Sequence, residues 1–276
     1  MELGISSWTV PWSIGIAGYP RPSKPLDPVG LLDKAVAVDV RRVQIADNLP
    51  LDQLDDHELD GLRAAAEERG LVLEAGTRGL DPDHLVRYVR IARRIGAPLL
   101  RTVLSGRLLG SDQLAQTEAA IRSVLPLLEK HEITLALENN EAFAAGQYSD
   151  LVMRISNPRV GICLDTANSL GRPETLELVV KHLAKHTVIL HAKDYDIRRV
   201  DTRMGFSVVG AVAGDGRVDF PWLLAELKQS AGDGFSVILE HWPPFERDIS
   251  TTVANEERWL TTSVEYLRRV LSTART

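Results

Sequence analysis

Acidic residues and a histidine follow four apolar runs in the second half of the chain, and these residue types could together hold a metal ion. The runs end in Leu-Glu-Asn-Asn, Cys-Leu-Asp-Thr-Ala-Asn, Leu-His-Ala-Lys-Asp and Ile-Leu-Glu-His, which carry Glu138, Asp165, His191 and Glu240. Three carboxylates brought together would repel one another unless a cation lay between them. Three oxygen ligands and one nitrogen suit Mn²⁺ or Mg²⁺, with Co²⁺ or Zn²⁺ as alternatives. We therefore predict one divalent metal ion as the cofactor, with Mn²⁺ as the first expectation.

Each of these signals taken alone has an ordinary structural explanation. An acid after an apolar strand often begins a turn or caps a helix, which would account for Asp165 and Asp194. A lone histidine on a strand, such as His191, is often a structural residue. Four such residues at consecutive strand ends favour the metal site, provided that the fold brings those ends together.

Short apolar runs alternate with helical patterns along the whole chain, and this alternation predicts such a fold. The helical segments show apolar periodicity or capping signals, as where Asp81-Pro82 opens a helix that Gly96 closes. No G-x-G-x-x-G, P-loop or G-x-S-x-G pattern is present. The prediction is one α/β domain over residues 1–276, a closed (β/α)8 TIM barrel in which all strand carboxyl ends meet at one mouth. The eight predicted strands are Leu3–Ser6, Arg42–Ala46, Leu71–Ala75, Leu99–Leu104, Ile133–Glu138, Val160–Asp165, Val188–Ala192 and Ser236–Glu240. The predicted helices are Asp52–Arg69, Pro82–Ile95, Gln113–Lys130, Ser149–Ser156, Glu174–Ala184, Phe220–Leu227 and Glu256–Leu271.

Two connections between these elements are unusually long. Pro11–Pro28 follows the first strand and holds five of the 14 prolines, and Tyr195–Asp219 follows the seventh strand. Long loops after barrel strands usually carry function, so both are expected beside the mouth. The alternative is that both are stiff decorations.

The strand-end segments resemble the sugar isomerase/epimerase superfamily, whose members have a xylose isomerase-like TIM barrel. The resemblance covers essentially the whole chain, and its four-strand ligand pattern is fairly specific. The superfamily includes ketose 3-epimerases, inosose dehydratases, hydroxypyruvate isomerase-like enzymes and apurinic endonucleases. It implies that Glu138, Asp165, His191 and Glu240 hold one metal ion, and that Glu138 and Glu240 also transfer protons.

Two departures from the superfamily pattern limit which of its branches this sequence can resemble. Several ketose epimerases have a substrate-contacting histidine three residues after the aspartate of the sixth strand, where this chain has Asn168. The endonuclease branch uses further histidines from earlier strands for a three-metal cluster. The second and third strands here end in Gln-Ile-Ala-Asp-Asn and Glu-Ala-Gly-Thr-Arg, without histidine. A DNA-repair function is therefore not expected.

Polar residues at the ends of strands two to four are candidates for binding the rest of a substrate. They are Gln44, Asn48, Glu74, Arg78 and Arg101. Two arginines there suit a carboxylate or phosphate, because a guanidinium pairs with either through two hydrogen bonds. The alternative is an ordinary salt bridge from Glu74 to Arg78 or Arg101.

Further substrate contacts are expected from Asn168, Lys193 and three tryptophans. Lys193 lies two residues after His191 and could orient a substrate oxygen. Trp8 and Trp12 follow the first strand and Trp242 follows the last, and these strands are neighbours in a closed barrel. The three rings could form one aromatic wall against the apolar face of a sugar. Core packing under the proline-rich loop is the alternative for them.

The composition limits the class of protein. Of the 276 residues, 44% are hydrophobic and 25% charged, and 32 Lys+Arg against 38 Asp+Glu give a net charge of −6. An acidic chain with dispersed basic residues is a poor match for nucleic acid, and the apolar runs are too short to span a membrane. The single Cys163 excludes an internal disulfide, and the N-terminal residues lack a signal-peptide pattern. We expect a cytoplasmic enzyme with a small sugar or sugar-acid substrate, and a homo-oligomer is left open.

The predicted site supports more than one reaction. A cation chelated by a substrate carbonyl and a neighbouring hydroxyl acidifies the C–H between them and stabilises an enediolate. The first choice is an isomerase or epimerase of a small keto-sugar or sugar acid, with Glu138 and Glu240 as the two proton carriers.

The main alternative is a decarboxylase that passes through the same type of intermediate. The segments Gln-Ile-Ala-Asp-Asn, Gly-Thr-Arg-Gly and Met-Gly-Phe are similar to a branch of the superfamily that includes 3-oxo-isoapionate decarboxylase. The arginines would suit the carboxylate of a 3-oxo sugar acid. A dehydratase and a non-catalytic sugar-binding barrel are further alternatives.

Overall fold

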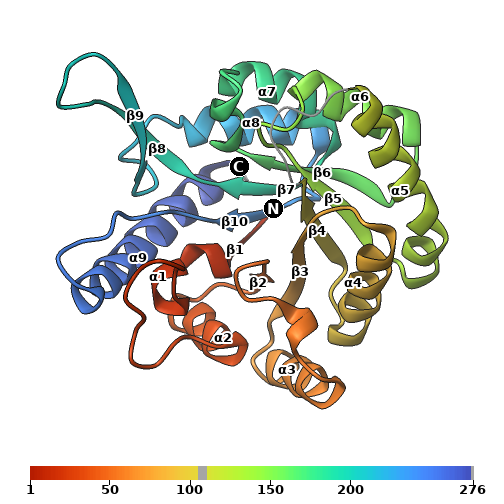
Figure 1. Cartoon of the computed structure of the whole chain (residues 1–276), viewed down its shortest axis with the longest axis horizontal. Coiled ribbons are helices and arrows are strands. Elements are labelled where there is room, and N and C mark those ends of the chain that lie inside the picture. Colours follow the sequence, from red (N-terminus) through yellow and green to blue (C-terminus); the bar gives the residue numbers. More distant parts are fainter. Residues whose placement is uncertain (105–110, 275–276) are drawn as a thin grey trace.

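The centre of the molecule is a closed barrel of parallel strands, which confirms the predicted fold (Figure 1). The computed structural model describes residues 1–104 and 111–274. The strand order around the barrel is β1-β10-β7-β6-β5-β4-β3-β2, and each predicted strand coincides with one of these strands. Their bounds are β1 Glu2–Ser6, β2 Arg42–Ile45, β3 Val72–Arg78, β4 Leu99–Val103, β5 Thr134–Glu138, β6 Val160–Asp165, β7 Thr187–Ala192 and β10 Ser236–Leu239.

Helices surround the barrel on its outer side (Figure 1). The sequence signals act as expected at α4, where the Asp81 side chain accepts a hydrogen bond from the backbone N–H of His84 and Pro82 opens the helix. Gly96 closes α4 at a φ of 72°, a left-handed conformation that favours glycine. The helices are α1 Pro11–Ile14, α2 Pro28–Ala37, α3 Asp56–Glu68, α4 Pro82–Ile95, α5 Ser111–His131, α6 Ala145–Ile155, α7 Leu176–Leu183, α8 Phe220–Ala231 and α9 Ile249–Ala274.

Both long connections contain regular structure that the sequence analysis missed. The proline-rich segment begins with the short helix α1 and is followed by α2. The second connection folds into an antiparallel hairpin of β8 (Asp194–Arg199) and β9 (Phe206–Ala211), which projects from the barrel in Figure 1.

Asp194 anchors this hairpin and the chain that follows it. Its carboxylate accepts hydrogen bonds from the backbone N–H groups of Tyr195, Gly214, Gly216 and Val218. A Cβ atom at position 216 would lie 2.1 Å from Asp194 Oδ1, so only glycine allows this approach. The turn-forming explanation is therefore correct for Asp194.

The barrel interior is layered beneath the mouth. Side chains alternate between the two faces of a strand, so the residues two positions before the predicted ligands also point inward. They are fully buried and pack against one another as an apolar floor under the mouth: Ala136, Cys163, Ile189 and Ile238.

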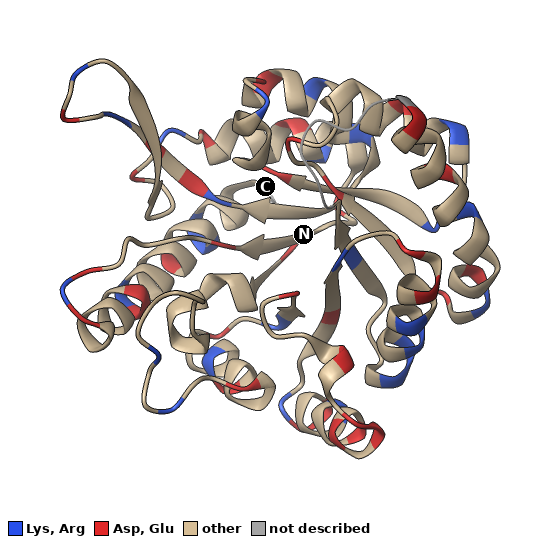
Figure 2. Cartoon of the chain, in the orientation of Figure 1, with Lys and Arg blue, Asp and Glu red and all other residues tan. Residues whose placement is uncertain are grey.

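Acidic and basic residues are interspersed along the outer helices, as Figure 2 shows. Among the described residues, no helix has the length and apolar character needed to cross a membrane.

Candidate metal centre

The structure brings the four predicted ligands together at the mouth of the barrel. The Nδ1 atom of His191 lies 3.4 Å from Glu240 Oε2, 3.5 Å from Glu138 Oε2 and 3.8 Å from Asp165 Oδ2. All four side chains are buried. Each comes from a different strand, so the cluster forms only when the barrel closes.

Three atoms of this cluster have the character of metal ligands. Asp165 Oδ2, His191 Nδ1 and Glu240 Oε2 are buried and lie within 4.8 Å of one another. Lys193 Nζ forms ion pairs with both carboxylate oxygens, whereas Nδ1 has no hydrogen-bond partner. Buried polar atoms are rarely left in this state, because their desolvation is costly. Two carboxylate oxygens and an imidazole nitrogen that converge in this way fit a divalent cation.

Glu138 differs from the other members of the cluster because both of its oxygens are engaged. Its Oε1 accepts a hydrogen bond from Asn168 Nδ2 at 2.6 Å, and its Oε2 accepts one from Arg101 Nε. Burial alone would raise the pKa of Glu138, but the charges of Arg101 and His191 outweigh burial and hold this pKa well below its usual value.

Backbone and side-chain donors fix the other two carboxylates. Asp165 Oδ1 accepts hydrogen bonds from the backbone N–H groups of Ala167 and Asn168, both at 2.8 Å, which leaves Oδ2 to face the cluster. Ser6 Oγ donates to Glu240 Oε1 at 2.8 Å, which likewise leaves Oε2 to face it. The sequence analysis missed Ser6, although its place at the end of the first strand could have indicated it.

Gln44 and Glu74 lie behind His191 and not in the substrate cavity. Gln44 Oε1 is 2.9 Å from His191 Nε2, and Gln44 Nε2 donates to Glu74 Oε2 at 3.0 Å. Both side chains are fully buried. Glu74 pairs with Arg42 and not with Arg78 or Arg101, so the salt-bridge alternative is wrong. The structure places Gln44 and Glu74, which were predicted substrate contacts, outside the lining of both cavities at the mouth. The stagger of the strands places these two residues below the mouth.

Positive charge surrounds the carboxylates. Lys193 Nζ lies 2.8 Å from Asp165 Oδ2 and 3.0 Å from Glu240 Oε2. Burial by itself lowers the pKa of Lys193, but Asp165, Glu240 and Glu138 raise it above its usual value, so the ammonium stays charged.

The imidazole of His191 responds to the same carboxylates. Burial lowers its pKa, and the negative charge around it more than compensates and raises it well above the usual value. Burial also raises the pKa of the Cys163 thiol to about 12, so Cys163 is neutral at pH 7. The raised pKa of His191 is therefore due to the carboxylates gathered at this centre and not to Cys163.

Two adjoining cavities open onto the cluster. The first, of about 430 Å³, is polar and is lined by several predicted substrate contacts, including Arg78, Arg101, Asn168 and Lys193. The second, of about 460 Å³, is more apolar and is lined by Trp8, Trp242, Leu170 and Val208 of the hairpin, among others. Trp8, Asn168, Lys193 and Glu240 border both cavities.

Two further predicted substrate contacts, Trp12 and Asn48, lie outside the lining of both cavities. Trp12 is buried, donates its indole N–H to the carbonyl oxygen of Pro243 at 2.7 Å, and packs against Tyr19 and Phe245. Of the three predicted tryptophans, Trp8 and Trp242 line the second cavity. Asn48 forms hydrogen bonds with Ser7 and lines neither cavity. Trp12 and Asn48 have structural roles because their polar groups already have partners in the protein.

Asp47 joins the residues of the polar cavity and was not selected from the sequence. It accepts hydrogen bonds from Trp8 Nε1 at 3.2 Å, Arg101 at 2.9 Å and Arg78 Nε at 3.0 Å. Burial raises its pKa, but the charges of Arg101 and Arg78 reverse this effect and lower it. Its position in Gln-Ile-Ala-Asp-Asn, directly after β2, was the available signal.

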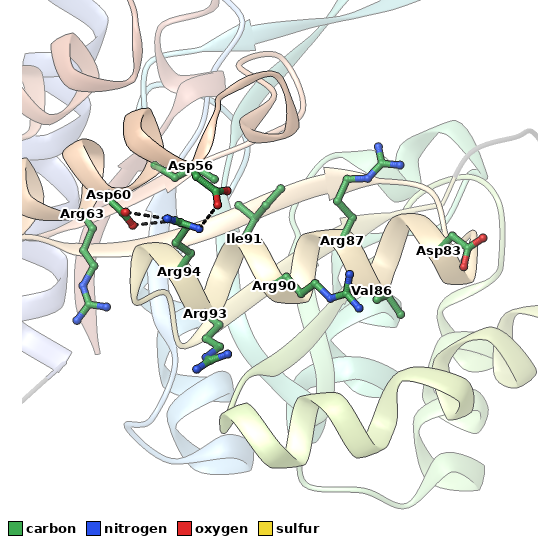
Figure 3. A pocket seen from close by; sticks show the side chains of 11 residues that line it. Asp56, Asp60, Arg63, Asp83, Val86, Arg87, Arg90, Ile91, Arg93 and Arg94 are labelled. Atoms are coloured by element: carbon green, nitrogen blue, oxygen red, sulfur yellow. Dashed lines mark hydrogen bonds and ion pairs between the residues drawn. The ribbon is translucent and has the colours of Figure 1, made fainter.

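A larger groove, of about 910 Å³, lies elsewhere, between α3 and α4. Figure 3 shows that Arg87 points up and Arg93 points down, on opposite sides of α4. Arg94 is paired with Asp56 and Asp60. Because its charged groups diverge or pair with one another, this groove lacks the converging polar groups of a small-molecule site.

Comparison with known proteins agrees with this geometry. Residues 32–270 match the family model described as a xylose isomerase-like TIM barrel. The chain belongs to this family. A curated relative, 3-oxo-isoapionate decarboxylase of Pectobacterium atrosepticum, is 31% identical over 269 residues, which cover 97% of this chain and 95% of the relative.

Solved structures share this xylose isomerase-like fold. A D-psicose 3-epimerase determined in the presence of D-fructose superposes with a TM-score of 0.73 at 14% identity and covers 98% of this chain and 99% of its own. A xylose isomerase-like TIM-barrel protein from Mycobacterium smegmatis in complex with magnesium has a TM-score of 0.71 at 13% identity, with coverage of 100% and 98%. At these identities the likeness concerns the fold. Among the relatives compared, the one that is similar in sequence is a decarboxylase, and the epimerase structures share the fold.

Proposed function

We propose that this xylose isomerase-like barrel is a divalent-metal-dependent enzyme that removes CO₂ from a small 3-oxo sugar acid. The observation that carries the proposal is the polar cavity, which joins three cationic side chains, Arg78, Arg101 and Lys193, to the cluster around His191. Arg101 and Lys193 already pair with carboxylates of the cluster, so half-exposed Arg78 is the cation that suits an anionic substrate. The decarboxylase relative, which matches almost the whole chain, supports the same reaction.

Each side of the cavity has its own role. Arg78 is half exposed and pairs with Asp47 through Nε, so the far end of its guanidinium can reach a substrate carboxylate. Asp165, His191 and Glu240 would hold the metal ion, with Glu138 beside them. When bound, the ion would supply a Lewis acid that stabilises negative charge on substrate oxygens. Lys193 lies at the same edge and adds a second positive charge there.

The environment of Glu138 favours decarboxylation over a two-base reaction. An effective general base has a pKa near the working pH, whereas the pKa of Glu138 is held well below its usual value and both of its oxygens accept hydrogen bonds. Loss of CO₂ needs no initial proton abstraction. The C–C bond to the carboxylate breaks, its electron pair remains on the sugar as an enediolate, and one solvent proton then completes the product.

Epimerisation of a keto-sugar is the second candidate, and one observation favours it. Glu138 Oε2 and Glu240 Oε2 lie at similar distances, 3.5 Å and 3.4 Å, from His191 Nδ1. Two carboxylates beside one centre are the arrangement that removal and return of a proton would require.

A single assay in D₂O separates the two reactions. Mn²⁺-loaded protein is incubated with a panel of 3-oxo sugar acids and keto-sugars, and CO₂ release and deuterium incorporation are measured. We expect one CO₂ per turnover, one deuterium in the product and none in the unreacted substrate. Deuterium exchange into a keto-sugar without CO₂ would reject decarboxylation and support the epimerase. Activity that persists at full rate in excess EDTA would reject the metal requirement.

A further inference from the structure

A chain of hydrogen bonds runs from His191 across the barrel interior to the beginning of β2. His191 Nε2 meets Gln44 Oε1 at 2.9 Å, Gln44 Nε2 donates to Glu74 Oε2 at 3.0 Å, and Arg42 donates to Glu74 Oε1 at 3.2 Å. Arg42 also pairs with Glu2. His191, Gln44 and Glu74 are fully buried, so water does not replace these contacts.

The chemistry of these groups decides which atom donates and which accepts in each of these hydrogen bonds. An ionised carboxylate can only accept hydrogen bonds, so Glu74 fixes the amide of Gln44 with Nε2 toward itself. Gln44 Oε1 must then face His191, and an amide oxygen can only accept. His191 therefore carries a proton on Nε2, which leaves the lone pair of a neutral imidazole on Nδ1. Nδ1 is the nitrogen that faces the three carboxylates.

We propose that Gln44 and Glu74 are positioning residues that select Nδ1 of His191 as the metal-binding nitrogen. The inference rests on the metal requirement of the proposed function and assigns these two residues a place in it. A partner that holds the second nitrogen of a ligating histidine fixes the tautomer and the orientation of the ring. Arg42 contributes by pairing with Glu74 and orienting its carboxylate.

Glu74 acts here through its charge as well as its shape. An uncharged glutamine at position 74 could either donate or accept, so the Gln44 amide could turn and present its N–H groups to His191. The imidazole proton would then move to Nδ1 and block the cation. Loss of such an outer partner typically weakens metal binding by about 10–100-fold.

The test measures the dissociation constant of Mn²⁺ by titration calorimetry in four variants. Gln44→Leu removes the acceptor at similar volume, and Glu74→Gln removes the charge at constant shape; each should bind Mn²⁺ about 10–100-fold more weakly. Ser236→Ala is the matched control, because Ser236 is buried in the barrel wall outside the chain of hydrogen bonds. Its affinity should equal that of the wild type.

The fourth variant combines Gln44→Glu with Glu74→Gln and exchanges the two side chains. The carboxylate then accepts directly from His191 Nε2–H, while the amide at position 74 bridges to Arg42. Charge and direction are both restored, so the double variant should bind Mn²⁺ within about threefold of the wild type. A purely structural role predicts instead that the two substitutions weaken binding additively.

A spectroscopic measurement on the wild type makes the inference independent of how the variants fold. The protein contains 7 histidines, and the ¹⁵N signals of His191 are identified by their loss in His191→Gln. During titration with diamagnetic Mg²⁺, Nε2 should keep its proton while Nδ1 loses its own. A proton retained on Nδ1 in the loaded protein overturns the inference, whatever the variants do.

The remaining outcomes separate this inference from the proposed function. Wild-type Mn²⁺ affinity in Gln44→Leu and Glu74→Gln would overturn the positioning role and leave the metal requirement intact. A wild-type protein that binds neither Mn²⁺ nor Mg²⁺ would overturn both together.

Discussion

Glu138 and Glu240 are the same residue type at equivalent strand ends, yet their surroundings make them chemically different. Glu138 accepts hydrogen bonds on both oxygens, whereas Glu240 uses Oε1 for Ser6 and turns Oε2 toward the cluster beside Lys193. Glu240 thus presents one oxygen to the cluster, and Glu138 presents a carboxylate already paired with Arg101. This asymmetry is the residue-scale basis for preferring a decarboxylase to a two-base epimerase.

The metal site is tested by removing one ligand at a time. Asp165→Asn and His191→Ala should each weaken Mn²⁺ binding at least about a hundredfold, since a direct ligand matters at least as much as an outer partner. Asp194→Asn is the control, because Asp194 is a buried strand-end acid that serves backbone N–H groups. It should lower stability and leave the Mn²⁺ dissociation constant unchanged. Unaltered Mn²⁺ binding in the Asp165 and His191 variants would refute the site.

Arg78 gives a residue-scale test of the anionic substrate. A hydrogen bond to a charged group contributes about 1.5–3 kcal/mol, and half-exposed Arg78 should contribute near the lower limit. Arg78→Met should therefore raise KM for the 3-oxo sugar acid about tenfold, with a smaller effect on kcat. Arg87→Met is the control, because Arg87 is similarly exposed but pairs with Asp52 outside the mouth. An equal rise in KM for a neutral keto-sugar would contradict the prediction.

At the scale of elements, Glu256 of α9 attaches the segment after β1 to the barrel. Its carboxyl group accepts hydrogen bonds from the backbone N–H of Trp12 at 2.7 Å, and from the N–H and Oγ of Ser13 at 2.9 and 2.6 Å. Burial raises the pKa of Glu256 to about 7, although Ser13, Trp12 and Lys34 oppose the shift. This contact fixes the direction in which the chain leaves β1 and hence the course of α1.

The raised pKa of Glu256 predicts a pH-dependent stability. The folded state binds this proton more tightly than the unfolded state, whose pKa is near 4.5. The stabilisation is therefore complete below pH 4.5 and is lost as the pH rises through about 7. Relative to Glu256→Gln, which does not titrate at this position, the free energy of unfolding of the wild type should fall by up to about 3 kcal/mol between these limits.

Urea unfolding at several pH values between 5 and 8 measures this difference. Glu257→Gln is the control, because Glu257 is the neighbouring carboxyl group but is exposed. Its pH profile should parallel that of the wild type. Parallel profiles for Glu256→Gln and the wild type would show that the Glu256 carboxyl group does not titrate in this range.

At the scale of the whole molecule, the candidate ligands couple distant parts of the chain. They lie on or directly after β5, β6, β7 and β10, so unfolding of any of these strands would disperse them. A cation that binds only the folded state stabilises the entire barrel by mass action.

This coupling predicts a metal-dependent melting temperature. Mn²⁺ at a hundred times its dissociation constant should add about 2.7 kcal/mol to the free energy of unfolding. For a domain of this size, that corresponds to a rise in Tm of about 5–10 °C, which EDTA should reverse. Calorimetric scans of the wild type and of His191→Ala provide the measurement, and the variant should show no rise. The same Tm with and without Mn²⁺ would contradict a stoichiometric site in the wild type.

The sequence by itself determined the barrel and the membership of the acidic cluster. Apolar runs of strand length, separated by capped amphipathic helices, are local patterns, and each run became a barrel strand. Once the strands are parallel and the barrel closes, residues at their carboxyl ends must meet at one mouth. Glu138, Asp165, His191 and Glu240 could therefore be placed together without any knowledge of their contacts.

Only the tertiary structure decided the depth of each side chain and its partners. Gln44 lies near the end of β2 just as Arg101 lies on β4, yet Gln44 is below the mouth and Arg101 reaches the cavity. The tilt and stagger of barrel strands mean that equal distance from a strand end is not equal height. Trp12 was likewise directed away from the mouth by Pro243 and Glu256, residues more than 200 positions later. Such contacts depend on how the chain returns to itself, and no local pattern encodes them.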